Sequence, residues 1–111
     1  MGAFNVLRAT CPCPSCTRVV PVAIQFKLGV TYQHEYAIGD AVRWGRNALG
    51  HAGAIHVVVD GVADGPCPDC GYACDRDFYV HVEQDRITRV EAADGRWDFV
   101  AARATFIVVR E

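Results

Sequence analysis

Two short cysteine segments, far apart in the chain, constrain its fold more than any other feature of the sequence. Cys13-Pro-Ser-Cys16 and Cys67-Pro-Asp-Cys70 each hold two cysteines separated by two residues, and residues 17–66 lie between the segments. A two-residue gap lets both sulfurs face one ion at about 2.3 Å, while backbone amides of the turn point at them. Two such turns supply four sulfurs, which is a complete tetrahedral shell. The sequence therefore predicts one metal site at these four cysteines, with zinc as the expected ion.

The pattern resembles the knuckles of zinc-ribbon and rubredoxin-like proteins. The resemblance covers the two C-P-x-C segments and the strands around them, and the stretch between the segments is far longer than in a minimal ribbon. It implies a structural four-cysteine site with one zinc ion per chain. Rubredoxin-type sites use similar knuckles for iron, and spacing alone does not separate the two metals. In the second knuckle, Gly71 can adopt the positive φ that such a turn often needs.

Two further cysteines, Cys11 and Cys74, lie close to the knuckles in the sequence. Four interpretations stay open for them: thiols with no part in the site, a pair that lies next to the metal ligands without binding the ion, a pair that can form a disulfide, or extra ligands of a larger cluster. Six thiolates without bridging cannot close two tetrahedral shells, which weakens the last interpretation.

Composition and charge narrow the class of protein. The chain has 111 residues, half of them hydrophobic and 22% charged. These values predict a single packed domain over residues 1–111. The formal net charge of −2 argues against broad electrostatic binding to nucleic acid, which usually needs a basic face.

The compartment is inferred from what the sequence lacks. No apolar run approaches the roughly 20 residues that span a bilayer, and the segment MGAFNVLRAT has no apolar signal-peptide core. We therefore expect a cytoplasmic protein without a membrane partner. In a reducing compartment, paired cysteines favour metal chemistry over disulfides.

Alternating apolar residues predict strands on both sides of each knuckle. From Val20 to Leu28 every second residue is apolar, as in a half-buried strand, and Pro21 places that strand at an edge or a bulge. Residues 4–10 are its expected hairpin partner. Residues 54–62 and 77–85 flank the second knuckle in the same way. Each knuckle is thus expected at the tip of a β-hairpin, with the metal joining the two tips.

The C-terminal third predicts an antiparallel meander, which completes an all-β fold. Gln84-Asp85 is a connection of hairpin length, and Asp94-Gly95 favours a type I′ turn leading into a strand over residues 96–100. One helical turn is expected over residues 100–104. The β-branched run over residues 104–109 predicts a last strand covered on both faces.

The least regular region, residues 29–53, is the candidate binding surface. Residues 32–38 and 41–44 favour two short strands joined by a turn at Gly39-Asp40, and the stretch 45–53 favours a surface loop. Loops carry recognition more often than strands do. The candidate binding residues are Trp44, Arg46, Asn47 and His51. The alternative is that Trp44 belongs to the core.

Catalytic motifs are absent from the sequence. His34-Glu35 lacks the second histidine that a zincin helix needs, and no nucleophile elbow or Walker A segment is present. His56 and His81 lie on predicted strands that could pair. With Asp60 or Glu83 they could form a second metal site, although exposed strand histidines are commoner than ligands.

These observations favour a small zinc-stabilised binding or accessory protein that acts by contact with another protein. A four-sulfur shell has no open position for water, so the zinc is expected to be structural, which favours a protein that is not an enzyme. Two alternatives remain: a nucleic-acid-associated zinc ribbon, and a redox or metal-handling protein that uses Cys11 and Cys74.

Overall fold

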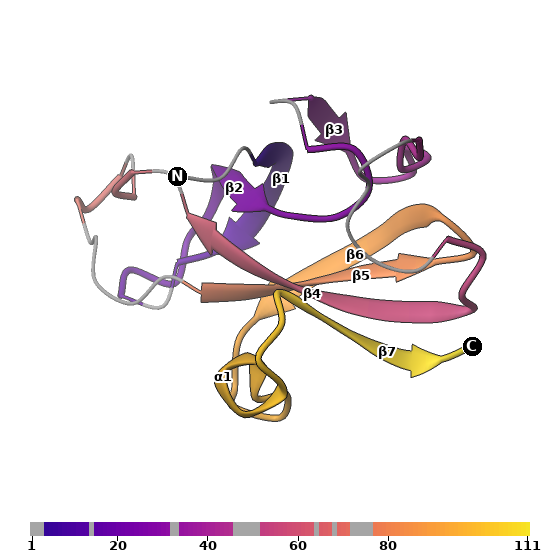
Figure 1. Ribbon diagram of the computed structural model, residues 1–111. Helices are drawn as coiled ribbons and strands as arrows, with labels where there is room; N and C mark the ends of the chain where they lie inside the picture. Colours follow the sequence, from indigo (N-terminus) through magenta and orange to yellow (C-terminus); the bar gives the residue numbers. More distant parts are fainter. Residues whose placement is uncertain are drawn as a thin grey trace.

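The computed structural model describes residues 4–13, 15–31, 34–45, 52–63, 65–67, 69–71 and 77–111. These residues form one seven-stranded sheet and one short helix (Figure 1). The elements are β1 (Asn5–Pro12), β2 (Val19–Phe26), β3 (Glu35–Ala37), β4 (His56–Ala63), β5 (Asp77–Glu83), β6 (Arg86–Ala92), α1 (Phe99–Ala102) and β7 (Phe106–Arg110). The predicted all-β class is confirmed. Within the described residues, no helix has the length and apolar character needed to cross a membrane.

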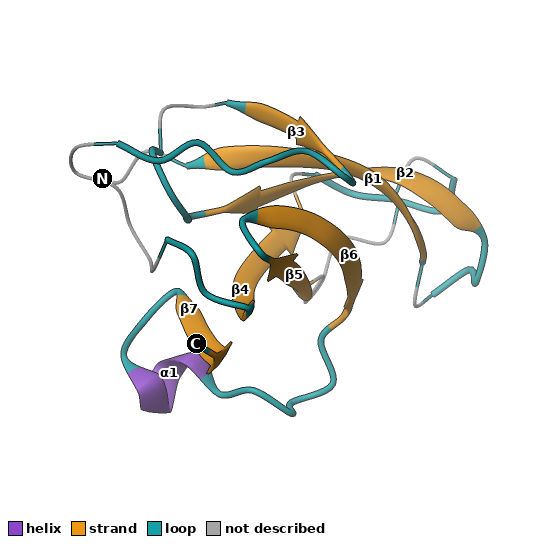
Figure 2. Ribbon diagram, turned by 90° about the vertical axis from the view of Figure 1, so that its right-hand side faces the viewer, coloured by secondary structure: helices purple, strands orange, loops and turns teal. Residues whose placement is uncertain are grey.

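The sheet is curled, so its two ends approach each other (Figure 2). Its strand order is β3-β1-β2-β4-β5-β6, with β1 and β3 parallel and the other pairs antiparallel. The segment after β3 returns to the start of β6. There the Gly39 N–H donates to the Ile87 carbonyl at 2.6 Å, and the Val42 N–H donates to the Asp85 carbonyl at 2.8 Å. These bonds connect the first and last strands of the order.

The main core fills the inside of the curl. The predicted alternation on β2 is confirmed, because its buried side chains are Val20, Val22, Ile24 and Phe26, and Leu28 continues them past its end. Burying each such side chain stabilises a fold by about 1.5–3 kcal/mol. Gly61 permits the close approach of β2 to β4, since a Cβ there would lie 2.7 Å from Ile24 Cγ2.

One edge of β4 is shared by two strands. Residues 61–63 pair with β2, and residues 56–59 pair with β7. At the junction the Asp60 N–H donates to the Thr105 carbonyl at 2.8 Å. Since β4 meets only the last three residues of β2, Pro21 lies where β2 is paired with β1 alone, in agreement with the edge position predicted for it.

The outer face of β4 and β5 carries a second layer. Val58, Tyr79 and His81 point away from the main core but are buried, with at most 2% of their surface exposed. The chain after β6 covers this face. The Trp97 ring contacts the rings of Tyr79 and His81 edge-on, with distances between ring centroids of 5.0 and 5.6 Å. In both ribbon views α1 and β7 lie on the side of the sheet away from β1 and β2 (Figures 1 and 2).

The meander differs from the prediction after β6. Gln84 and Asp85, with φ of 52° and 65°, form the left-handed turn between β5 and β6. The hairpin predicted at Asp94-Gly95 is wrong, since residues 93–98 form no strand. Instead the Asp94 carboxylate accepts from the Arg96 N–H at 3.0 Å, and the chain turns towards α1. The local Asp-Gly signal describes a turn but not the strand after it.

The last strand also differs in its surroundings. The helical turn predicted over residues 100–104 exists slightly earlier in the chain as α1, which follows the N-cap Asp98 and ends at Ala102 before the left-handed C-cap Arg103. β7 then pairs with β4 and not with its neighbour in sequence, β6. It is not covered on both faces, because its side chains are half-buried or exposed and Val109 is 44% exposed.

The region before β4 is less regular than predicted. Of the strand expected over residues 32–38, the structure forms β3 at residues 35–37, and Tyr32 lies outside the described residues. The strand expected over residues 41–44 is a single bridge between Ala41 and Arg86. The buried Asn5 amide stabilises this region, because it donates to the carbonyls of Leu28 and Val30 at 3.0 and 3.2 Å.

Candidate metal centre

The first knuckle is the tip of the β1–β2 hairpin. The Cys13 N–H donates to the Arg18 carbonyl at 2.9 Å, which closes the hairpin. The Thr17 N–H donates to the Cys13 carbonyl at 2.8 Å. Thr17 has φ of 63°, a left-handed conformation that non-glycine residues adopt at a cost. Both cysteines of the knuckle thus lie on one tight, hydrogen-bonded turn.

The second knuckle repeats this turn in the connection between β4 and β5. The Gly71 N–H donates to the Cys67 carbonyl at 2.9 Å, and Gly71 has φ of 76°. The positive φ predicted at this glycine is confirmed. The residue after the second cysteine therefore has the same conformation and the same backbone bond in both knuckles, and it is glycine in only one of them.

The two turns bring the four cysteine sulfurs together. Cys13 Sγ lies 3.7 Å from Cys70 Sγ, and Cys16 Sγ lies 3.9 Å from Cys67 Sγ. All four sulfurs lie within 4.8 Å of one another. Four sulfurs at 2.3 Å from one ion form a tetrahedron with edges of about 3.8 Å, and both close pairs match that length. A disulfide would need about 2.05 Å. The group could therefore hold a single metal ion.

The electrostatics of the first knuckle favour a thiolate at Cys13. The backbone N–H of Cys16 lowers the pKa of Cys13 to about 6, against the opposing effect of burial. At Cys16 the N–H of Arg18 lowers the pKa, but burial and the neighbouring thiols outweigh it and raise the pKa to about 11. One negative charge is thus stabilised by the turn itself, whereas a second charge beside it needs a cation.

Burial is uneven around the four sulfurs. Cys13 and Cys67 are buried in the core, whereas Cys16 is half-buried and Cys70 is exposed. One ion pair crosses between the knuckles outside the shell, with Arg18 Nη1 3.7 Å from Asp69 Oδ2. Exposed pairs of this kind contribute at most about 1 kcal/mol. This ion pair is therefore too weak to hold the two hairpin tips together, and the four-sulfur group is the main link between them.

The two remaining cysteines have different outcomes. Cys11 is opposite Val20 on the β1–β2 ladder and is buried in the main core. It is not a member of the four-sulfur group. Cys74 lies outside the described residues, so the interpretations of this cysteine stay predictions.

The candidate binding loop is described only at its two ends, because residues 46–51 lie outside the described part of the chain. Trp44 is half-buried and packs against the main core, in agreement with the alternative reading of this residue. Its indole N–H is buried, and none of the described residues accepts a hydrogen bond from it. Arg46, Asn47 and His51 lie outside the described residues.

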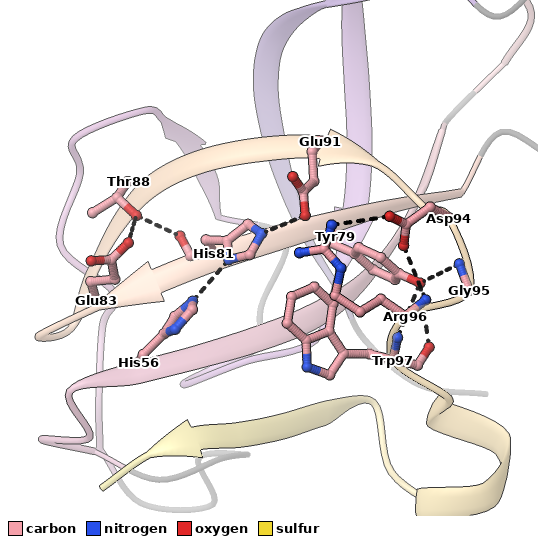
Figure 3. A network of polar contacts seen from close by, with 10 residues as sticks. All are labelled: His56, Tyr79, His81, Glu83, Thr88, Glu91, Asp94, Gly95, Arg96 and Trp97. Atoms are coloured by element: carbon pink, nitrogen blue, oxygen red, sulfur yellow. Dashed lines mark hydrogen bonds and ion pairs between the residues drawn. The ribbon is translucent and has the colours of Figure 1, made fainter.

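The structure brings His56 and His81 together, as strand pairing suggested (Figure 3). His56 Nε2 lies 2.8 Å from His81 Nδ1, and His81 Nε2 lies 3.0 Å from Glu91 Oε1. The carboxylate of this cluster is Glu91, and neither Asp60 nor Glu83. Among the described residues, only the four cysteines form a group of three or more ligand atoms within 4.8 Å. His56 and His81 thus form no such group with Asp60 or Glu83, the carboxylates that the sequence suggested.

The surroundings of His81 explain why it is not an exposed strand histidine. The Trp97 segment covers it, and burial lowers the pKa of His81, although the hydrogen bond that the ring donates to the Glu91 carboxylate opposes this shift. Glu91 on β6 alternates onto the same face as Arg89, which pairs with His81 across the strands. This alternation along β6 is the sequence signal that could have identified Glu91 as the hydrogen-bond partner of His81.

Comparison of the chain with protein-family models, with curated proteins and with solved structures finds no match in any of the three. The function is therefore inferred from the residues of this chain alone.

Proposed function

We propose that this protein is a small zinc-stabilised binding protein that acts by contact with another protein. One zinc ion per chain, held by Cys13, Cys16, Cys67 and Cys70, joins two hairpins in a zinc-ribbon-like arrangement. The observation that carries the proposal is the set of sulfur separations, 3.7 and 3.9 Å, between cysteines of different knuckles. The proposal includes a cytoplasmic location, where paired cysteines stay reduced.

The positions of the four sulfurs support a structural role for the ion. Holding the two knuckles together across residues 17–66 costs about 3–4 kcal/mol of loop-closure entropy. A structural zinc site contributes on the order of 10 kcal/mol, which exceeds that cost. Four protein sulfurs leave no coordination position for water or a substrate, so the ion supplies stability and no hydrolytic chemistry.

A protein partner fits the charge of the chain better than nucleic acid does. The formal net charge is −2, and the basic residues are balanced by 13 acidic ones. Proteins that bind nucleic acid through phosphates need a concentration of Lys and Arg on one face. A mildly acidic surface instead complements a neutral or basic protein surface.

Two measurements test the proposal. Elemental analysis of the purified chain should give one zinc per chain and no visible absorbance; iron would give a coloured protein, and two zinc ions would make Cys11 and Cys74 ligands. A partner recovered with the native protein should then bind the purified zinc-loaded chain. Binding of DNA or RNA at roughly 50 mM salt, where phosphate contacts are strong, would overturn the protein-binding proposal.

Loss of an activity when Cys11 or Cys74 is replaced by Ser would instead indicate redox or metal-handling chemistry. Under the binding proposal both replacements leave the partner's affinity unchanged, provided that the variant still holds its zinc. Metal content is therefore measured on every variant.

A further inference from the structure

A pocket of about 440 Å³ lies on the outer face of β4 and β5, and none of the four knuckle cysteines lines it. The chain that follows β6 forms its other wall. The side chains that give it its chemical character are Asp60, Asp77, Tyr79, Trp97, Asp98 and Phe99. The pocket thus combines three carboxylates with three aromatic rings.

The charges in this pocket are unbalanced. None of the described residues that line it is Lys, Arg or His; the neighbouring Arg96 guanidinium lies 5.0 Å from the Trp97 ring centroid and is paired with Asp94. Asp60 is half-buried, and within the described part of the chain no ion pair or hydrogen bond reaches its carboxylate. Burial, and to a smaller extent the charge of Asp77, raise the pKa of Asp60. A cation bound between these two carboxylates would remove both unfavourable effects.

The aromatic wall is held in place by the sheet. The Tyr79 hydroxyl accepts hydrogen bonds from the Gly95 N–H at 2.8 Å and the Trp97 N–H at 3.3 Å, and Figure 3 shows it pointing into this loop. The rings of Trp97 and Phe99 lie 5.0 and 6.0 Å from the Tyr79 ring. Because this wall is already ordered in the free protein, less conformational entropy is lost when a ligand binds.

The spacing of the carboxylates decides between a metal ion and an organic cation. A bound metal ion needs several ligand oxygens around one point, at 2.0–2.6 Å from the ion. Asp60, Asp77 and Asp98 do not form a group of ligand atoms within 4.8 Å of one another, as the four cysteines do. Asp98 is also engaged as the N-cap of α1, where it accepts from the Ala101 N–H at 3.0 Å. The pocket therefore suits a larger cation with apolar substituents.

We propose that this pocket binds an organic cation, a primary ammonium or guanidinium group carried on an apolar stem. Asp60 and Asp77 hold the charged head, and the rings of Trp97 and Phe99, which pack on the buried Tyr79 ring, contact the methylene groups of the stem. A free alkylamine and a Lys or Arg side chain of another protein share this chemistry. The site is separate from the four cysteines and does not depend on the function proposed for them.

The test is an NMR titration of the zinc-loaded full chain, followed at the Trp97 indole N–H and the Gly95 amide. The probes are n-butylamine, a blocked Gly-Lys-Gly peptide and, as the neutral control, n-butanol. Asp60→Asn and Asp77→Asn each remove one carboxylate from the pocket with almost no change in shape. Glu83→Gln makes the same change at the other end of β5, outside the pocket, and serves as the matched control variant.

A cation site predicts saturable shifts with a charged probe and none with butanol. Asp60→Asn and Asp77→Asn should weaken binding about tenfold each, as expected for a lost charge-assisted bond, while Glu83→Gln binds like the parent. Affinity should also fall as the pH is lowered and Asp60 is protonated. Binding of both charged probes identifies a site for small cations, and binding of the peptide alone identifies a site for a basic side chain.

Three results would overturn the proposal. Neither charged probe shifts the two signals, butanol shifts them as butylamine does, or the aspartate variants bind as tightly as Glu83→Gln. Each variant is first shown to hold one zinc and to keep the dispersed amide spectrum of the parent, so that loss of the fold is not mistaken for loss of the site.

Discussion

Thr17 and Gly71 occupy the same position in the two knuckles, with φ of 63° and 76° and the same backbone bond to the first cysteine of each turn. Glycine adopts this conformation freely, whereas a residue with a Cβ loses about 1–2 kcal/mol. The two halves of the metal centre are therefore alike in geometry but unequal in backbone strain.

This inequality predicts a stabilising substitution. Thr17→Gly should raise the free energy of unfolding by up to about 1 kcal/mol, because the relief of strain is partly offset by the greater entropy of glycine in the unfolded chain. Thermal melts of zinc-loaded protein measure the effect. Thr17→Ala is the control, since it removes the hydroxyl but keeps the Cβ. A Thr17→Gly variant that melts below Thr17→Ala would contradict the strain argument.

Removing a sulfur from the metal centre should cost the cooperative fold. Cys16→Ser or Cys67→Ser leaves three thiolates, and the loss of on the order of 10 kcal/mol of metal binding exceeds the net stability of many small domains. We expect no cooperative melting transition and less than one zinc per chain. The measurement is a melt with metal content determined on the same sample.

Cys74→Ser is the matched comparison for the ligand variants, because it changes a cysteine that we do not assign to the four-sulfur shell. It should keep its zinc and its cooperative transition with at most a modest shift. If Cys67→Ser melted like the parent while Cys74→Ser collapsed, the choice of ligands would be wrong.

His81 makes stability depend on pH in a defined direction. Burial holds its pKa below the ordinary value near 6.5, so the unfolded chain binds this proton more readily than the folded chain does. The stabilising contribution is therefore present above about pH 6.5 and is lost as the pH falls through the lower folded pKa.

Denaturant unfolding between pH 8 and 5 measures this contribution as the difference between the parent and His81→Gln. Protonation of the cysteines at low pH affects both proteins and cancels in the difference. The parent should lose more stability than His81→Gln over this range. Parallel curves would show that His81 does not titrate on unfolding.

Tyr79 connects the outer face of the sheet to the loop before α1. Tyr79→Phe keeps the buried ring but removes the hydroxyl that binds Gly95 and Trp97, which should cost about 1–2 kcal/mol. Hydrogen exchange of these two amides should become faster than in the parent. Tyr36→Phe removes a comparable hydroxyl bond, from the Arg43 N–H at 3.2 Å, and should leave both amides unchanged.

Local chemistry in the sequence determined the parts of the fold that depend on neighbouring residues. The spacing of Cys13 to Cys16 and of Cys67 to Cys70 specified two turns, and the alternation from Val20 to Leu28 specified which side chains are buried. Both follow from backbone geometry over a few residues, where turn shape and the two-residue period of a strand leave little choice.

Only the tertiary structure decided which distant segments meet. The hairpin predicted at Asp94-Gly95 does not form, because the Tyr79 hydroxyl, sixteen residues earlier in the chain, binds the Gly95 N–H and holds this segment against the outer face of the sheet. The chain after β6 also buries His81 and forms one wall of the pocket beside Asp60. β7 pairs with β4 along the part of its edge that β2 leaves unpaired. These outcomes depend on which apolar faces of the sheet remain uncovered after the hairpins form. Burial of those faces requires contacts between residues far apart in the sequence, so no short stretch of sequence determines it.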